Sequence, residues 1–120
     1  MNAFVLIIEA QDTEKILNCL HCFAVVPGDV VYIPAGTPHA LEAGSLVAEI
    51  QEPVDITLRA ERIRPDGSVL PEESLHGGKG MDILLDCFDF TCMERERARE
   101  RFFVKPQPLV SDGDARAVRS

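Results

Sequence analysis

The chain has 120 residues, of which 46% are apolar and 27% are charged. The length allows one domain at most, and these proportions are typical of a globular protein and argue against wholesale disorder. The formal net charge of −8 argues against nucleic acid as a partner, because such binding requires a basic surface. No apolar run is long enough to cross a bilayer, and the start of the chain lacks the basic region of a signal peptide. We therefore expect a cytoplasmic protein with no membrane partner.

Two elements are expected at the start of the chain. Residues 2–10 fit either a short strand or the buried face of a short helix, because their apolar residues suit both patterns. Asp12 has the side chain of a helix N-cap, so we expect a helix over residues 13–20.

A series of short strands is expected next. β-Branched and aromatic residues are frequent between turn signals such as Pro27-Gly28-Asp29 and the stretch from Pro34 to Pro38. Short strands with turns about every eight to twelve residues are typical of an antiparallel sandwich or barrel. The expected strands are residues 23–26, 30–33, 39–41, 46–51 and 56–63.

The following part of the chain is expected to contain a loop, an apolar segment and one helix. His76 lies in the loop over residues 71–80, where we expect it to be exposed. Residues 81–90 are expected to pack back on the sheet as strand or loop. Residues 91–94 have the form of a capping box, which predicts a helix over residues 92–102.

The predicted helix alternates acidic and basic side chains that largely cancel. Such alternation indicates a solvated helix face with local ion pairs rather than an RNA-binding surface. Residues 104–110 are expected to be extended, and the polar residues 111–120 to form a flexible tail. One domain over residues 1–110 is therefore predicted.

The four cysteines allow two interpretations. Cys19 and Cys22 flank His21, a spacing that could be half of a zinc site or a redox pair. Cys87 and Cys92 lie far away in the sequence with a different spacing. The alternative is a set of buried or half-buried free thiols in a reducing compartment.

His39 is the sharpest candidate for chemistry. It follows a tight turn built from Pro34, Gly36 and Thr37, which would direct an imidazole inward, where it could bind a metal. Taken alone, a histidine after a turn is more often structural, so the surrounding pattern decides between the two. Asp29 is expected to cap its own turn rather than to take part in catalysis.

The run Gly-Asp-x-x-x-Ile-Pro-Ala-Gly-Thr-x-His, residues 28–39, resembles the second cupin motif. The continuation through Glu-Ile-Gln-Glu-Pro, residues 49–53, to Arg59 resembles the type I mannose-6-phosphate isomerase family. The resemblance covers residues 12–109, and it is most specific over residues 27–59.

The resemblance implies a mainly β, cupin-like partial barrel (a double-stranded β-helix or jelly-roll) with short flanking helices. It also implies a cofactor, zinc or another divalent metal, and a sugar phosphate substrate. The family interconverts mannose 6-phosphate and fructose 6-phosphate through an enediol. His39 matches a metal ligand of the family, and Arg59 matches a catalytic arginine of the sugar pocket.

Glu49 and Gln51 are candidate substrate-binding residues. They are two positions apart on one predicted strand, so their side chains would share a face and could hydrogen-bond sugar hydroxyls. The alternative for Glu49 is a carboxylate paired with Arg59 or Arg62.

The chain departs from the family pattern because an earlier motif with further metal ligands is missing. One histidine does not hold zinc without other ligands. We therefore expect an incomplete, C-terminal unit of an isomerase that forms a homo-oligomer through unpaired strand edges. The alternatives are a non-catalytic cupin module that binds a sugar or small anion, and a structural fragment that binds no ligand.

Overall fold

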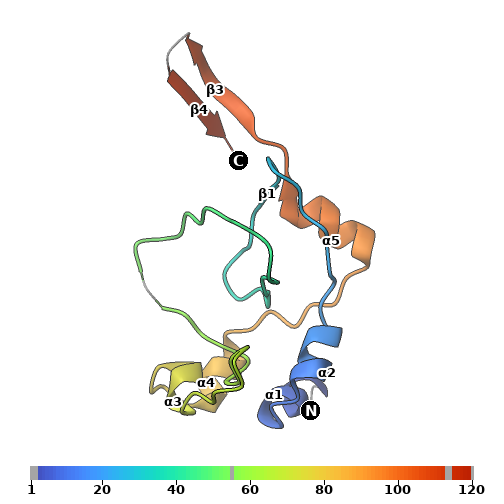
Figure 1. Ribbon diagram of the computed structural model, residues 1–120, viewed down its shortest axis with the longest axis vertical. Helices are drawn as coiled ribbons and strands as arrows, with labels where there is room; N and C mark the ends of the chain where they lie inside the picture. Colours follow the sequence, from blue (N-terminus) through green and yellow to red (C-terminus); the bar gives the residue numbers. More distant parts are fainter. Residues whose placement is uncertain (1–2, 55, 113–114, 120) are drawn as a thin grey trace. The chain divides into compact units, whose positions relative to one another are not determined.

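A computed structural model describes residues 3–54, 56–112 and 115–119, with side chains for residues 5–54 and 56–107 (Figure 1). The chain divides into two compact units. The first unit comprises Met1–Leu20 and Gly36–Phe90, and the second comprises His21–Ala35 and Thr91–Ser120. This division does not test the prediction of one domain over residues 1–110, which stays a prediction.

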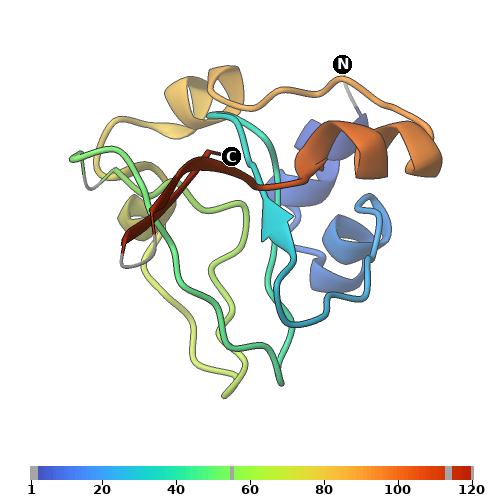
Figure 2. The ribbon, with the colours of Figure 1, turned by 90° about the horizontal axis from the view of Figure 1, so that it is seen from above.

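The first unit begins with two short helices, α1 (Ala3–Glu9) and α2 (Thr13–Asn18), which pack side by side (Figures 1 and 2). Residues 2–10 had two possible interpretations, and the described part of this range forms the helix. The predicted N-cap is confirmed, since the Asp12 carboxylate accepts a hydrogen bond from the Lys15 N–H at 3.1 Å. The Lys15 ammonium lies 2.7 Å from the same carboxylate, and its hydrogen bond lowers the pKa of Asp12.

The first unit ends with two more helices, α3 (Glu73–His76) and α4 (Met81–Asp86), which also pack together. Residues 81–90 were predicted to be strand or loop. This prediction was wrong for residues 81–86, which form α4. Met81, Leu84 and Leu85 recur at helical spacing, and Leu84 is fully buried. The apolar residues of this segment therefore have the spacing of a helix rather than that of a strand.

His76 is buried, with only 7% of its surface exposed. Its Nδ1 accepts a hydrogen bond from the Gly80 N–H at 3.0 Å, which closes the connection between α3 and α4. The prediction of an exposed loop histidine was therefore wrong. The neighbouring Gly77 has a φ of 59°, the left-handed conformation that ends a helix, and so α3 stops directly after His76.

In the described part of the second unit there are one helix, α5 (Arg95–Phe102), and two antiparallel pairs of strands. β1 (Val30–Val31) pairs with β2 (Phe103–Val104), which follows directly from α5. β3 (Gln107–Asp112) and β4 (Ala115–Arg119) form a hairpin at the C-terminal end (Figure 1). Flexibility of residues 111–120 remains a prediction, and residues 113, 114 and 120 lie outside the described part of the chain.

Two local predictions in the second unit have different outcomes. The Asp29 carboxylate accepts a hydrogen bond from the Val26 N–H at 2.9 Å, so Asp29 caps its turn as expected. The capping box over residues 91–94 was wrong, because α5 begins at Arg95 and its N-cap residue Glu94 makes no side-chain cap bond. The helix start therefore lies beyond the predicted box.

The mainly β, cupin-like barrel predicted from the sequence is wrong. The described residues contain five helices and four strands, and the strands form only the two pairs above, besides one isolated bridge between Ile63 and Val69. Only Val30–Val31 of the five predicted strands is a strand. β-Propensity reflects the fit of a side chain to neighbours on a sheet, and residues 39–51 find no such neighbours. Leu46, for example, is fully exposed.

None of the helices in the described residues is long and apolar enough to cross a membrane.

Gly36 holds the predicted turn against the segment that follows α4. Its carbonyl accepts a hydrogen bond from the Asp89 N–H at 2.8 Å. Its φ is +80°, and a Cβ at this position would lie 2.6 Å from the Cys87 carbonyl oxygen. Both the backbone conformation and the close approach therefore require glycine.

We expect Gly36→Ala to lower the free energy of unfolding by at least about 2 kcal/mol, from backbone strain plus the collision with Cys87. Gly44→Ala is the matched control, because Gly44 has a φ of +92° and nothing within 4 Å of a Cβ. Gly44→Ala should cost only about 1 kcal/mol. Urea unfolding of both variants measures the difference, and equal losses would contradict the close contact at Gly36.

Candidate functional site

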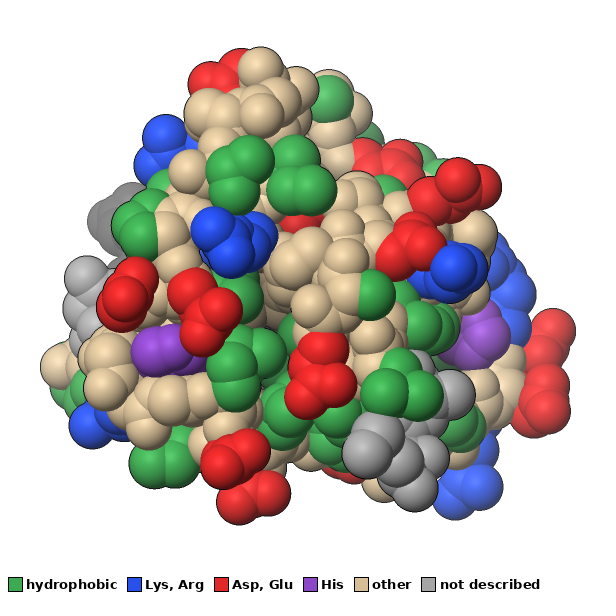
Figure 3. All heavy atoms as spheres, turned by 90° about the horizontal axis from the view of Figure 1, so that it is seen from below, with side chains coloured by type: hydrophobic (Ala, Val, Ile, Leu, Met, Phe, Trp, Pro, Cys, Tyr) green, Lys and Arg blue, Asp and Glu red, His purple; other side chains and the backbone are tan. Residues whose placement is uncertain are grey.

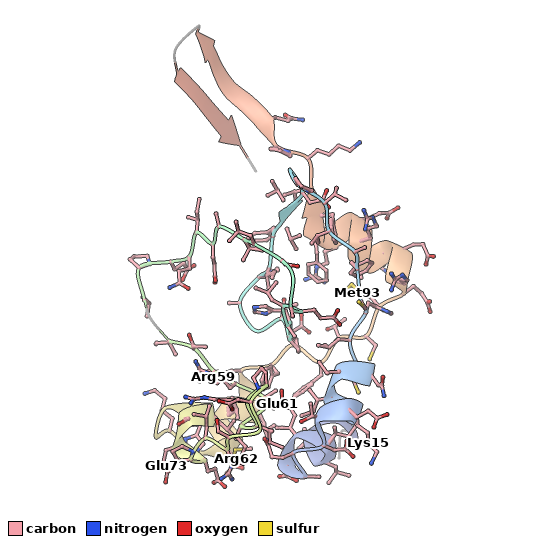
Figure 4. All side chains as sticks on the ribbon, in the orientation of Figure 1. Lys15, Arg59, Glu61, Arg62, Glu73 and Met93 are labelled. Carbon is pink, nitrogen blue, oxygen red and sulfur yellow. The ribbon has the colours of Figure 1, made fainter. Side chains whose placement is uncertain are left out.

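The segment that carries Arg59 is anchored through its backbone. The Arg59 N–H donates to the Leu75 carbonyl at 3.0 Å. One side chain, that of Gln11, then bonds two more groups: its Nε2 donates to the Ala60 carbonyl at 3.0 Å, and its Oε1 accepts from the Arg62 N–H at 2.8 Å. Residues 59–62 therefore have a fixed path although they lie outside any helix (Figure 4).

Gln11 occupies the corner between α1 and α2 with a φ of +52°, an uncommon conformation for a residue other than glycine. Its Nε2 also donates to the Ile8 carbonyl at 2.7 Å. The carboxamide thus joins the corner to a segment about fifty positions further along the chain.

Two further side-chain bonds hold the same segment. The Thr13 hydroxyl donates to the Glu61 carboxylate. The Arg62 Nε–H donates to the Leu70 carbonyl at 2.9 Å. Glu61 and Arg62 are therefore structural residues of this segment, whereas Arg59 contributes its backbone and keeps its side chain exposed.

The guanidinium of Arg59 is available for a ligand. Within the described residues, an ion pair joins Lys15 to Asp12, and none joins Arg59 or Arg62 to Glu49. The alternative interpretation of Glu49 as a structural partner of these arginines therefore has no support in the structure. An unpaired guanidinium offers several N–H donors in a fixed fork.

His39 is exposed, and its Nδ1 lies 2.8 Å from the Thr37 carbonyl oxygen. A carbonyl oxygen only accepts, so Nδ1 is the donor in this bond. In the neutral imidazole, Nε2 then carries a lone pair. Histidines that bind metals commonly donate their other ring N–H to a backbone carbonyl in this way. The geometry is thus compatible with His39 as one metal ligand.

Glu49 and Gln51 lie on an exposed stretch that forms neither helix nor paired strand. The strand geometry that would place both side chains on one face is therefore absent. Among the described residues, no hydrogen bond or ion pair links any two of His39, Glu49, Gln51 and Arg59. The roles predicted for these four residues stay predictions.

The described residues do not form a complete metal site. They contain no group of three or more His, Cys, Asp or Glu side chains that could hold an ion, and zinc requires three or four ligands. The structure gives no support to the interpretation of Cys19 and Cys22 as half of a zinc site. The expectation of buried or half-buried thiols was wrong, since all four cysteines are exposed, two of them, Cys19 and Cys87, at helix C-caps.

The sequence interpretation missed Gln11 and the burial of His76. Gln11 gives no local signal, because its partners Ala60 and Arg62 are distant in the sequence. A signal for His76 exists in the Gly77-Gly78 pair, which ends a helical turn directly after it.

Comparison with known proteins gives a partial match. A protein of Bacillus subtilis (strain 168) named "Probable mannose-6-phosphate isomerase GmuF" is 40% identical over 80 residues, which cover 64% of this chain and 24% of that protein. A second protein of the same organism, named "Putative mannose-6-phosphate isomerase YvyI", is 38% identical over 81 residues, which cover 65% of this chain and 24% of that protein.

The chain therefore spans about a quarter of the length of the curated relatives it matches. No family model and no solved structure matches it. The chain is thus similar to proteins named as mannose-6-phosphate isomerases over about two thirds of its own length.

We expect Gln11→Ala to lower the free energy of unfolding by about 1–3 kcal/mol, because half-buried backbone groups of Ile8, Ala60 and Arg62 lose their partner. Amide hydrogen exchange gives a local measurement: exchange of the Arg62 N–H should accelerate. The Arg64 N–H, which bonds the Ser68 carbonyl, should keep its rate.

Gln11→Glu is the matched control, since it keeps an acceptor but loses both donors. It should protect the Arg62 N–H better than Gln11→Ala does. Unchanged exchange at Arg62 in both variants would show that the carboxamide does not hold this segment.

Proposed function

We propose that this chain is part of a sugar-phosphate isomerase that interconverts mannose 6-phosphate and fructose 6-phosphate in the cytoplasm. The observation that carries the proposal is its 38–40% identity, over about 80 residues, to two proteins named for that activity. The motif around residues 28–39 and Arg59 is its second support.

Arg59 has the central role in the proposed chemistry. Moving a proton between C1 and C2 of the sugar passes through an enediol, in which negative charge develops on oxygen. A guanidinium remains charged at any physiological pH and donates two parallel hydrogen bonds to such an oxygen pair. The anchored backbone of residues 59–62 would hold this group in place and reduce the reorganisation needed during the reaction.

The other predicted residues have supporting roles in this proposal. Glu49 and Gln51 would hydrogen-bond sugar hydroxyls. His39 would be one ligand of zinc or another divalent ion through Nε2, and the remaining donors would have to come from outside the described residues. Since the chain spans a quarter of its relatives' length, we propose that it is an incomplete unit of the enzyme.

A chimera tests the activity separately from the completeness of the chain. The matched segment of GmuF is replaced by that of this chain, and conversion of mannose 6-phosphate is measured by a coupled assay. We expect the chimera to turn over substrate and Arg59→Lys to lower its kcat/KM by about 10²–10³-fold, because lysine lacks the planar fork. Arg64→Lys, in a turn outside the site, is the control.

Two outcomes count against the proposal. A chimera that folds, as judged by circular dichroism, but has no turnover contradicts the isomerase function of the segment. Turnover by the pure 120-residue chain with added zinc contradicts the proposal that the chain is an incomplete unit of the enzyme.

We also propose that two copies of the chain associate through the exposed apolar side chains of residues 41–54 and 56. The support is an accumulation of exposed large apolar side chains on a stretch that forms neither helix nor paired strand, with Leu46 and Ile50 at 102% and 99% exposure. Hydrophobic side chains reach the molecular surface at several places (Figure 3). Clustered exposure of this kind marks interaction sites, and a segment with unpaired backbone groups can pair with its own copy.

Light scattering over a concentration series tests this association. We expect the dimer to become more stable at high salt. Each chain carries a net charge of −8, and salt weakens the repulsion between two such chains. Leu46→Lys combined with Ile50→Lys should give monomers, although both changes reduce the negative charge. Val26→Lys with Val69→Lys, at positions 64% and 60% exposed, should leave the dimer intact. A wild-type chain that stays monomeric throughout refutes the association.

A further inference from the structure

α5 carries arginines on two faces. Arg95 and Arg99 are four positions apart and share one face, while Arg97 and Arg101 share another. The Arg95 guanidinium carbon lies 4.6 Å from the centre of the Phe23 ring. The Arg99 carbon lies 4.4 Å from the centre of the Phe103 ring and 6.0 Å from that of Phe23. Both cations thus lie beside the Phe23 ring, and Arg99 also lies over the Phe103 ring.

The aromatic side of this arrangement is itself fixed. The Phe23 and Phe103 rings meet edge to face with centres 5.4 Å apart. His21 Nε2 donates to the Met93 carbonyl at 2.8 Å, which ties the stretch before Phe23 to the residues before α5. The two arginines therefore pack against a defined surface of the second unit.

The charges of Arg95 and Arg99 are not neutralised within the described residues. Ion pairs along this helix were predicted from the alternating charges, but none is present in the part of the chain that the structure describes. Contact with a ring face leaves the guanidinium N–H donors unused. Two adjacent guanidinium groups with unused donors are suited to an oxyanion of two negative charges.

A shallow pocket lies between these side chains. Its volume is about 130 Å³, and it is lined by Phe23, Arg95, Glu96 and Arg99. Ligand pockets for drug-sized molecules measure about 300–1,000 Å³, so this one fits a small group only. We propose that Arg95 and Arg99 bind a phosphate group here, either free phosphate or the phosphate of a monoester.

The proposal is independent of the isomerase function, because the pocket belongs to the second unit and includes neither His39 nor Arg59. Glu96 opposes anion binding, and the negative net charge of the chain does the same at longer range. Binding is therefore expected to be weak, to fall as salt rises, and to tighten when the Glu96 charge is removed.

Titration of the intact chain with inorganic phosphate, at constant ionic strength in chloride, tests the site. We expect saturable NMR shifts of the Arg95 and Arg99 Nε–H signals. Arg95→Gln with Arg99→Gln should weaken binding at least about tenfold, since two charge-assisted contacts are lost. Arg97→Gln with Arg101→Gln changes the net charge equally and should alter affinity less than about twofold.

Two more variants keep the test decisive if the glutamine pair unfolds. Arg95→Lys with Arg99→Lys keeps the charge but loses the fork, and should weaken binding severalfold. Glu96→Gln should strengthen it. Equal weakening by both glutamine pairs, or no saturation with the wild type, overturns the proposal, since binding would then reflect diffuse charge or not occur.

Mannose 6-phosphate, with mannose as the neutral control, identifies the source of the phosphate group. Tighter binding of the ester than of inorganic phosphate supports a sugar phosphate as occupant, and equal binding supports free phosphate. Binding of mannose with the same affinity as its phosphate contradicts a phosphate site. Because the readout is binding rather than turnover, failure here leaves the isomerase test unaffected.

Discussion

The Gln11 carboxamide is the interaction on which the first unit most depends. One amide supplies two donors and an acceptor, and Gln11 uses them on Ile8, Ala60 and Arg62. Residues 59–62 have no helix to satisfy their backbone groups. A half-buried N–H or carbonyl without a partner would cost about 1–3 kcal/mol. The corner between α1 and α2 therefore holds the backbone directly after Arg59, while the Arg59 N–H itself bonds the Leu75 carbonyl.

Local chemistry was predictable from the sequence, whereas long-range pairing was not. Asp12 and Asp29 act on groups within three residues, so their capping roles could be inferred correctly. The predicted strands required neighbours that no local pattern specifies, and Leu46 shows that a β-prone residue can remain exposed without them. The apolar residues around Leu84 have helical spacing, but this segment was predicted to be strand or loop because a sheet was expected beside it.

The roles of the candidate site residues stay predictions. The motif singled out His39, and the bond between its Nδ1 and the Thr37 carbonyl is compatible with metal binding through Nε2 of the neutral imidazole. The environment of α5 could not be inferred from the helix alone. Its alternating charges suggested ion pairs, but Arg95 and Arg99 contact Phe23 and Phe103, one of which lies some seventy positions away. Contacts of this kind become visible only when distant segments are placed together.

The exposed residues 41–54 also have a consequence for the fate of the chain in a cell. Short apolar segments with high β-propensity are sites where chains aggregate or where chaperones bind. Glu49 interrupts the apolar side chains of Leu46, Val47 and Ile50, and Glu52 follows closely. Charged residues in and beside such a segment act as gatekeepers that slow stacking of identical chains. These glutamates would thereby oppose the formation of fibrils by this stretch.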